Sequence, residues 1–474
     1  MTLPRPLTVA IVGAGPSGIY AAEALCGQSE VPVEVAVLDR LPVPFGLVRY
    51  GVAPDHHSIR SIRNTLERTL EKAHVRFYGN VGIGTDLSLA ELRGTVDAVI
   101  YAYGAGADRQ LGIPGEDLEG SIAAPELVAW YCGHPDVHPD VVGTRIRTLS
   151  SDELAERAAG LIAQVREAVV VGVGNVALDV ARVLIKTADE LNDTDMADDV
   201  LAALARKQVA NVHLLGRRGP AYTNFTTKEL RELGQLPGVD VHVDARDLEL
   251  DTSSAAVVAQ DKVAARNLAV LREWAERPPT GAARRIFLHF WVRPVRLLGT
   301  GHVEAVEVER TGISPTGAVE GRGQNRRIPA QLVVRSIGYR GLPLPGVPFD
   351  ASTGRVPHAE GRVIRDGGFS PNEYVTGWIK RGPTGVIGTN KSDAVETVTS
   401  LLTDVHDGAV VPGHSLAELD ALLAARGITA LDLPAWHRID AAEVHLGASH
   451  GRLRTTLAHR SELMAAAQDG EISA

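Results

Sequence analysis

The chain has 474 residues, of which 45% are hydrophobic and 22% are charged. These fractions are typical of globular chains, exclude disorder, collagen or a coiled coil as a whole-chain description, and at this length suggest two or three domains. The net charge of −10 argues against a nucleic acid or an anionic membrane surface as the main partner, because both require a basic face.

The cysteines and the N-terminal segment bear on the compartment. Cys26 and Cys132 are far apart in the sequence, which predicts no disulfide framework, no C-x-x-C redox pair and no Cys-rich metal or iron–sulfur site. The first residues lack the long apolar segment of a secretory signal, and no run of 18 apolar residues occurs. We therefore expect a cytoplasmic protein without a membrane anchor and without a bound metal.

The first informative segment is a nucleotide-binding pattern near the N-terminus. A β-branched run over residues 7–12 predicts a buried parallel strand, and a G-x-G-x-x-G motif and a helical segment follow it. The motif glycines are Gly13, Gly15 and Gly18. A second strand over residues 33–38 leads to Asp39, 26 residues after the first glycine, near the usual position of an acid that binds a ribose hydroxyl. The alternative is a glycine turn without a ligand.

The pattern returns 159 residues later. A strand over residues 168–171 leads into Gly172, Gly174 and Ala177, and a helix follows. The strand over residues 212–215 ends in Arg217 and Arg218 rather than in an acid. Arginine pairs with a 2′-phosphate that an acid would repel, so this site is typical of NADP. A solvated basic turn is the alternative for these arginines.

Two nucleotide sites in one chain suggest a flavin and a nicotinamide cofactor. The fold class is then α/β with two dinucleotide-binding, Rossmann-like domains, the NADP domain being inserted into the FAD domain. We expect the FAD domain at residues 1–105 and 331–474, ending in a C-terminal helical tail, and the NADP domain at residues 106–330.

Three later segments also have the pattern of strands that can complete these two nucleotide sites. Strands that run into glycine turns are predicted at residues 97–105, 332–339 and 374–378, the last ending at Trp378. A glycine-rich loop then precedes a helix that we expect to begin near Ser392, where a helix N-terminus can stabilise negative charge on a reduced flavin. Residues 310–327 are typical of an exposed hairpin or loop.

Several longer segments are more specific than the fingerprints. They are PVPFGLVRYGVAPDH at 42–56, GNVALDVAR at 174–182, GRRGP at 216–220, FTTKELREL at 225–233, VVRSIGYRG at 333–341 and GWIKRGPTGVIGTNK at 377–391. With these segments nearly the whole chain resembles the adrenodoxin-reductase-like ferredoxin–NADP reductases. The resemblance implies hydride transfer from NADPH to FAD and then single-electron transfer to a small iron–sulfur ferredoxin, which supplies a haem monooxygenase or another ferredoxin-dependent enzyme. We expect a cytoplasmic monomer whose contact with the ferredoxin is transient and electrostatic.

The resemblance also implies a set of site residues. Against FAD it places, besides the fingerprint glycines, Ser17, Asp39, Leu47, Val81, Trp378, Gly385, Val386 and Ile387. Against NADP it places, besides Gly172 and Gly174, the residues Arg109, Asn175, Val176, Ala177, Arg217, Arg218, Glu229 and Gly385. Asp39 departs from the family, which usually has glutamate there, and this puts the FAD affinity in question.

His56 and Glu232 match the polar pair that the family carries near the nicotinamide and the flavin. As a site residue, His56 would hydrogen-bond the flavin edge or tune its potential. Glu229 and Glu232 are three residues apart on a helix predicted over residues 227–233, which puts both on one face. A structural histidine and a solvated acidic face are the alternatives.

Competing functions differ in what they require. A disulfide reductase needs a proximal dithiol, and the small-subunit type of glutamate synthase adds a Cys-rich region; this sequence carries neither. An NADPH-dependent flavin monooxygenase uses similar folds but reacts with oxygen itself, and a non-catalytic nucleotide sensor is the remaining alternative.

The resemblance implies an acidic ferredoxin, so a local basic surface is needed on this acidic chain. The candidates, all in the inserted domain, are Arg206, Lys207, Lys228, Arg231, Arg284, Arg285, Arg293 and Arg296. Scattered solvated charges are the alternative.

Overall fold

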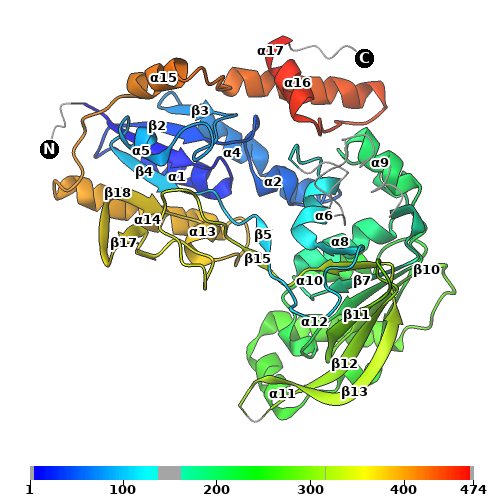
Figure 1. Cartoon of the computed structure of the whole chain (residues 1–474). Helices are drawn as coiled ribbons and strands as arrows, with labels where there is room; N and C mark the ends of the chain where they lie inside the picture. The colour runs from blue at the N-terminus through cyan, green and yellow to red at the C-terminus, as the bar shows by residue number, and fades with distance from the viewer. Residues whose placement is uncertain (1–4, 137–161, 315, 470–474) are drawn as a thin grey trace. The chain divides into compact units, whose positions relative to one another are not determined.

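The computed structural model describes residues 5–136, 162–314 and 316–469 (Figure 1). The chain separates into two compact units, of which the first is Met1–Ala107 with Gly338–Ala474 and the second is Asp108–Ile337. The second unit is therefore inserted into the first. The chain returns to the first unit at Gly338 rather than at residue 331, because strand β14 (Leu332–Arg335) pairs with strands of the second unit.

The first unit is built on a seven-stranded sheet. Its order is β16 (His358–Ala359), β17 (Arg362–Arg365), β18 (Gly368–Val375), β4 (Ala98–Tyr101), β1 (Leu7–Val12), β2 (Val33–Leu38) and β3 (Val75–Tyr78). The five strands from β18 to β3 are parallel, and every residue of β1 is buried, which matches the unbroken apolar run predicted for it. The register aligns Val12 with Leu38 and with Tyr101, and Tyr101 with Val375, so the segments that follow these strands meet at one edge.

Helix α1 (Pro16–Gly27) follows β1 and packs against α14 (Thr389–His406). The strand expected over residues 374–378 is wrong at its end. Gly377 adopts a φ of 78°, which breaks the strand, and Trp378 begins the short helix α13 (Trp378–Arg381). Helix α14 begins at Thr389, earlier than the Ser392 that we expected. The other helices of this part are α2 (Leu47–Tyr50), α3 (His57–Arg60), α4 (Arg63–Leu70) and α5 (Leu89–Arg93).

The second unit contains a six-stranded parallel sheet. Its order is β6 (Ser121–Ala123), β14, β7 (Glu167–Val171), β8 (Asn211–Leu215), β10 (Arg284–His289) and β9 (Val239–Val243). Its helices are α6 (Ala124–Tyr131), α8 (Asn175–Ile185), α9 (Asp198–Ala205), α10 (Thr227–Leu233), α11 (Thr252–Gln260) and α12 (Lys262–Glu276). A mainly parallel sheet in the first unit and a parallel sheet in the second, each with crossover helices, are the α/β class predicted from the sequence.

A three-stranded antiparallel sheet completes the second unit. It consists of β11 (Val292–Leu298), β12 (Ala305–Ile313) and β13 (Val319–Pro329), and the pairing of β12 with β13 confirms the hairpin predicted around residues 310–327. Val306 and Val308 of β12 pack with Val169 and Val171 of β7 in one buried cluster. Short strands β5 (Ala107–Asp108) and β15 (Tyr339–Arg340) lie where the chain passes between the units.

The C-terminal tail is helical, as predicted, and belongs to the first unit. It forms α15 (Leu416–Ala425), α16 (Leu433–Ser449) and α17 (Arg460–Asp469). Leu416, Leu419 and Leu423 of α15 join the buried cluster that contains Tyr78 and Val81, which anchors the tail on the sheet. Within the described ranges, none of the helices combines the length and the apolar content that crossing a bilayer requires.

Candidate functional site

The first fingerprint forms a tight loop between β1 and α1. Gly13 has a φ of 115°, and a Cβ there would lie 2.6 Å from the carbonyl oxygen of Ala102. A Cβ at Gly18 would lie 2.0 Å from the carbonyl oxygen of Gly13, so both glycines are required by packing. At Gly15, in contrast, a Cβ would have Gly46 Cα at 3.9 Å as its nearest neighbour. The backbone at Gly15 is thus accessible, as the approach of a pyrophosphate requires.

Asp39 follows β2 and is fixed beside this loop. Its Oδ2 accepts a hydrogen bond from the backbone N–H of Ala14 at 2.8 Å, and its Oδ1 accepts one from Leu41 at 2.9 Å. Burial raises the pKa of Asp39, and these two N–H groups oppose that rise. The Asp39 carboxylate is therefore anchored to the fingerprint backbone.

The returning C-terminal segment contacts the same loop through α1. Ser17 Oγ donates to Asn390 Oδ1 at 2.8 Å, and a Cβ at Gly377 would lie 2.2 Å from that Ser17 Oγ. Asp393 accepts from the backbone N–H of Gly377 at 2.5 Å and from Lys380 Nζ at 3.0 Å. Asn390 and Asp393 were not predicted as site residues. Their spacing relative to Ala394, Val398 and Leu401, which puts them on the buried face of α14, is the sequence signal that could have found them.

The other residues expected at FAD lie on the same unit. Val386 is exposed at 63% in a loop where Gly385 has a φ of 82°, so this loop presents apolar surface together with accessible backbone. Ile387 is half-buried, and Trp378 packs its ring 5.3 Å from that of Tyr339. Val81 is buried, and its backbone N–H donates to the carbonyl oxygen of Asp39 at 2.8 Å.

The segment after β2 carries Leu47 and His56. Leu47 is half-buried at the start of α2, and His56 is buried at 6% exposure, immediately before α3. The backbone N–H of His56 donates to Ala53 at 3.0 Å, which closes a turn at this point. His56 is therefore held by its own backbone within a compact segment of the first unit.

The second fingerprint repeats the geometry of the first in the second unit. Gly172 has a φ of 137°, and a Cβ there would lie 2.1 Å from the carbonyl oxygen of Ser336. A Cβ at Gly174 would meet nothing within 4 Å. Ala177, the third residue of the fingerprint, is fully buried, as expected for the position where the helix packs closely on the strand. Asn175 begins α8 with Val176 after it, and its Oδ1 accepts from the backbone N–H of Thr226 at 2.8 Å.

Arg217 and Arg218 follow β8 and expose their guanidinium groups on a fixed backbone. The carbonyl oxygen of Arg217 accepts from Thr311 Oγ1 at 2.9 Å, and the Arg218 guanidinium lies 5.3 Å from the centre of the Tyr222 ring. Arg109 is also exposed, at the start of the second unit. Three exposed guanidinium groups on this unit are available to a phosphate.

Helix α10 spans Thr227–Leu233, as predicted, and places its two acids differently. Glu229 is buried at 8% exposure and accepts from Thr226 Oγ1 at 2.9 Å. The side chain of Glu232 is 32% exposed and lies 3.8 Å from Lys228 Nζ. Glu229 is thus fixed at the helix start, whereas Glu232 is the acid of α10 that a ligand can reach.

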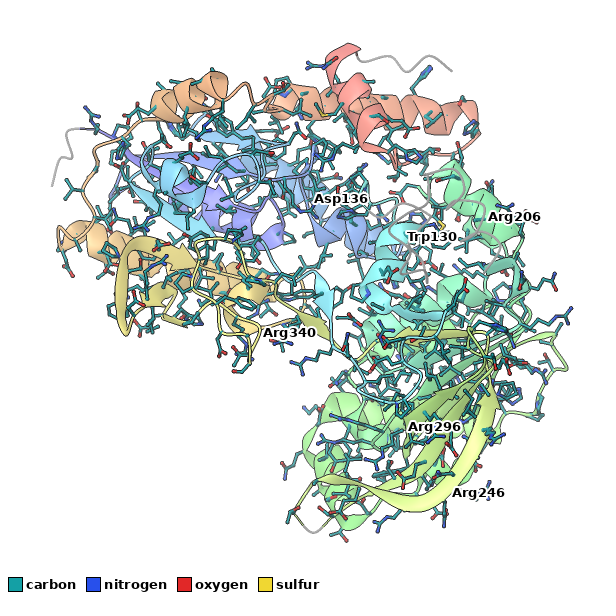
Figure 2. The ribbon with its side chains drawn as sticks, in the orientation of Figure 1. Trp130, Asp136, Arg206, Arg246, Arg296 and Arg340 are labelled. Atoms are coloured by element: carbon teal, nitrogen blue, oxygen red, sulfur yellow. The ribbon has the colours of Figure 1, made fainter. Side chains whose placement is uncertain are left out.

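Several of the basic residues expected to meet the ferredoxin are engaged in contacts within the second unit. Lys207 is half-buried and donates to the carbonyl oxygen of Val183, and burial lowers its pKa to about 7. Arg284 pairs with Glu190 at 2.5 Å, Arg293 pairs with Glu309 at 2.7 Å, and Arg285 Nε donates to Asn211. The exposed members are Arg206, Lys228, Arg231, Arg285 and Arg296, of which Lys228 also pairs with Glu232. Arg206 and Arg296 are labelled in Figure 2.

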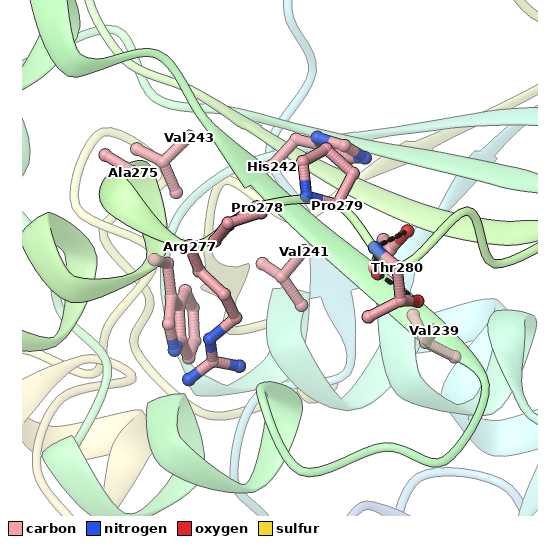
Figure 3. A pocket seen from close by; sticks show the side chains of 11 residues that line it. Val239, Val241, His242, Val243, Ala275, Arg277, Pro278, Pro279 and Thr280 are labelled. Atoms are coloured by element: carbon pink, nitrogen blue, oxygen red, sulfur yellow. Dashed lines mark hydrogen bonds between the residues drawn. The ribbon is translucent and has the colours of Figure 1, made fainter.

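A separate pocket of about 220 Å³ lies beside β9, the edge strand of the six-stranded sheet (Figure 3). It is lined by strand β9 and by Trp274, Ala275, Arg277, Pro278, Pro279 and Thr280. The Asp240 carboxylate accepts from the Thr280 backbone at 3.1 Å and from the Thr280 hydroxyl at 2.8 Å. Because this lining contains none of the residues expected at NADP, we assign the pocket to the packing of the edge strand.

The fold and its two fingerprints define an oxidoreductase class that binds two nucleotides, with one nucleotide-binding unit inserted into the other. The model of the pyridine nucleotide-disulphide oxidoreductase family matches residues 7–313. The chain is 44% identical to NADPH-ferredoxin reductase FprA of Mycobacterium tuberculosis, over 97% of this chain and 99% of that protein. It is 37% identical to the mitochondrial NADPH:adrenodoxin oxidoreductase of Arabidopsis thaliana, over 98% and 96% of the two chains.

The solved structure of Mycobacterium tuberculosis FprA in complex with NADPH superposes with a TM-score of 0.88 at 43% identity, covering 98% of this chain and 100% of that one. The chain belongs to the adrenodoxin-reductase-like ferredoxin–NADP reductases of the pyridine nucleotide-disulphide oxidoreductase family.

The second glycine of each fingerprint has room for a Cβ, so its substitution by alanine tests the two predicted nucleotide sites directly. Gly15 and Gly174 have φ values of −78° and −118°, which alanine adopts without strain, and a Cβ fits at both positions. We expect Gly15→Ala to fold normally and to lose most of its FAD, and Gly174→Ala to fold normally and to raise the KM for NADPH by about tenfold, because the methyl group occupies space that a pyrophosphate needs.

The measurements are apoprotein melting, FAD content and NADPH kinetics. Gly18→Ala is the matched control, because its methyl group would overlap the Gly13 carbonyl, so the melting temperature should fall strongly. Normal FAD content in a well-folded Gly15→Ala protein would contradict the placement of the first site.

Proposed function

We propose that this protein transfers hydride from NADPH to FAD and then passes single electrons to a ferredoxin. The observation that carries the proposal is the pair of fingerprints, each with its second glycine open, one in each unit of a chain that is 44% identical to an NADPH-ferredoxin reductase. When bound, NADPH supplies a hydride and FAD accepts two electrons that it can release one at a time. The protein contributes binding, orientation and electrostatics.

The residues present fit a flavin in the first unit. Asp39 offers its carboxylate to a ribose, the accessible backbone at Gly15 suits a pyrophosphate, and Val386 offers apolar surface to a ring system. Leu47, Val81, Trp378 and Ser17 complete the set that we assign to FAD. Ser17 acts by joining the fingerprint helix to Asn390.

The second unit fits NADP(H). Gly174, Asn175 and Val176 lie at the start of α8, where backbone N–H groups favour an anion. Arg217 and Arg218 are the groups that we assign to the 2′-phosphate, and Arg109 to a further phosphate or ribose contact. Glu229 and Gly385 are assigned to NADP by the family pattern.

His56 and Glu232 are the residues that we assign to hydride transfer. We propose that His56 hydrogen-bonds the flavin edge and that Glu232 lies near the nicotinamide, since His56 is held in a compact buried turn and Glu232 is the more exposed acid of α10. Holding the reacting groups in position is the main catalytic requirement, because the chemistry belongs to the cofactors.

The partner is proposed to be a small, acidic iron–sulfur ferredoxin that docks transiently on Arg206, Lys228, Arg231 and Arg296 of the second unit. The same proposal includes a monomeric, cytoplasmic reductase that supplies a haem monooxygenase or another ferredoxin-dependent enzyme. A flavin monooxygenase would instead consume oxygen in proportion to NADPH. Anaerobic NADPH-driven reduction of an added ferredoxin, with cytochrome c as the terminal reporter, tests the proposal; NADPH oxidation that occurs only with stoichiometric oxygen uptake would contradict it.

We expect a preference for NADPH over NADH that depends on Arg217 and Arg218. Each charge-assisted bond to the 2′-phosphate contributes about 1.5–3 kcal/mol, so a net discrimination of about 3 kcal/mol corresponds to roughly 100-fold in affinity. The R217A/R218A variant should lose most of this preference, measured as the ratio of kcat/KM for the two nucleotides. An unchanged ratio would show that the 2′-phosphate is bound elsewhere.

We expect His56→Gln and Glu232→Ala to retain FAD and the wild-type melting temperature but to slow anaerobic flavin reduction by NADPH about 10- to 100-fold, because positioned acid–base groups typically contribute at least this much. Stopped-flow absorbance measures the rate. His57→Gln, on the exposed residue next to His56, is the matched control and should react at the wild-type rate. Unchanged rates in both variants would assign them a structural role.

We expect ferredoxin-dependent turnover to fall with ionic strength, because steering by exposed charges is screened over a Debye length of about 8 Å at 0.15 M salt. The K228E/R231E variant should raise the KM for ferredoxin several-fold while the NADPH reduction of small dyes stays nearly normal. Arg246→Glu, an exposed basic residue outside the proposed surface, is the control (Figure 2). A flat salt profile with an unchanged KM would place docking elsewhere.

A further inference from the structure

The segment from Phe45 to His56 begins with two residues that contact the first fingerprint loop and have a positive φ. Phe45 has a φ of 82° and Gly46 a φ of 48°. The Phe45 backbone N–H donates to the carbonyl oxygen of Ala14 at 2.8 Å, and a Cβ at Gly46 would lie 3.0 Å from Gly15 Cα. A left-handed aromatic residue persists only where its surroundings hold it. Other contacts must therefore hold Phe45 and Gly46 on the loop.

One such contact is a buried ion pair with the C-terminal tail. Arg49 in α2 is 5% exposed and Glu443 in α16 is fully buried. Arg49 NH1 donates to Glu443 Oε2 at 3.0 Å, and Arg49 NH2 donates to Glu443 Oε1. The pair is bidentate, which fixes the orientation of both side chains. It joins residues that are 394 positions apart in the chain.

Glu443 also accepts hydrogen bonds from the turn that follows α16. Its carboxylate accepts from Arg454 NH1 at 2.7 Å and from the backbone N–H of Leu457 at 3.0 Å. Burial disfavours the charged carboxylate, yet the two guanidinium groups of Arg49 and Arg454 hold the pKa of Glu443 below its ordinary value. Glu443 is therefore an ionised, fully buried acceptor that four donor groups orient.

A second contact covers the strained residue itself. The ring of Trp436 in α16 meets the ring of Phe45 edge-on, with 5.5 Å between centroids and 83° between planes. The Arg49 guanidinium lies 5.6 Å from the centre of the Trp436 ring. Trp436 Nε1 donates to Glu67 Oε1 at 2.9 Å, which ties the indole to α4. Helix α16 thus contacts both ends of the turn that Phe45 and Arg49 form.

We propose that α16 is a positioning element of the flavin site, in which Glu443 acts through Arg49 and Trp436 acts through Phe45 to hold residues 45–56 on the fingerprint loop. The proposal rests on the proposed function, in which FAD binds at this loop and His56 meets the flavin. Neither Glu443 nor Trp436 is assigned a contact with the cofactor. A bidentate ion pair fixes the orientation of the segment that carries Arg49. Apolar packing alone would not fix this orientation, because it has no preferred direction.

The test separates positioning from stability. Glu443→Gln leaves a buried guanidinium without its full charge partner, so both melting temperature and FAD affinity should fall. The R49M/E443L variant replaces the pair by apolar side chains, and such replacements are often neutral or stabilising. Arg454 keeps Asp440 as its partner at 2.6 Å in this variant. We expect its melting temperature to recover only in part, because Arg454 NH1 and the Leu457 N–H also lose the Glu443 acceptor, while FAD binding stays about tenfold weaker and flavin reduction by NADPH stays slow.

Trp436→Leu provides a milder variant in which every ion pair is retained. We expect it to fold, to bind FAD several-fold more weakly and to shift the flavin absorption maximum. Arg426→Gln is the matched control, since it removes an exposed ion pair between the end of α15 and Glu91 in α5 and should change none of these quantities. The dissociation constant is measured by the quenching of FAD fluorescence on binding.

The outcomes distinguish this proposal from the proposed function. Wild-type protein that binds no FAD would contradict the proposed function. Wild-type protein that binds FAD, together with wild-type affinity, spectrum and reduction rate in both R49M/E443L and Trp436→Leu, would overturn the positioning role alone and leave α16 as a stabilising helix.

Discussion

Both glycine fingerprint loops depend on one close backbone contact at the carboxyl ends of parallel strands. Gly13 leaves β1 and lies against the carbonyl of Ala102, which follows the neighbouring strand β4. Gly172 leaves β7 and lies against the carbonyl of Ser336, which follows β14. A side chain at either glycine would overlap that carbonyl, so the loop could not lie there. With the first glycine in place, the second is turned toward open space at the start of a helix.

The first fingerprint also needs residues from the part of the chain that follows the insertion. In the first unit the strand that carries Ala102 comes before the insertion, whereas β18, α13 and α14 come after it. The fingerprint helix is completed by Asn390, 373 residues after Ser17, and Asp393 secures the Gly377 turn beside it. A buried polar network of this kind has a cost unless each member has a partner, and Lys380 and Arg381 supply partners to Asp393.

The C-terminal tail also packs on the first unit and contacts the region of the fingerprint loop. Its first helix, α15, adds leucines to the core cluster that contains Tyr78 of β3, and its Asp420 accepts hydrogen bonds from Arg76 and Tyr78. Its second helix, α16, attaches through charge and aromatic contacts to the segment that begins at the fingerprint loop. The contact of α16 with Phe45 reaches the strained turn at Phe45 and Gly46.

Local patterns in the sequence determined what depends on local geometry. The spans of β1, β2 and α10 and the two glycine fingerprints could be read directly, because apolar runs, helical spacing and the glycines of a tight turn act over a few residues. Two nucleotide folds followed from the fingerprint repeat, and the return of the chain to the first fold followed from the later strands that run into glycine turns. Gly377 nevertheless ended β18 earlier than its apolar run suggested.

Only the tertiary structure decided which polar side chains are engaged. Lys207 and Arg284 were both predicted to belong to an exposed basic surface. In the structure, Lys207 is half-buried and donates to the carbonyl oxygen of Val183, and Arg284 is paired with Glu190. The pairing of Arg49 with Glu443, like that of Ser17 with Asn390, joins positions hundreds of residues apart. No local periodicity encodes such pairs, because they form only when separate elements of the chain fold onto the same edge of one sheet.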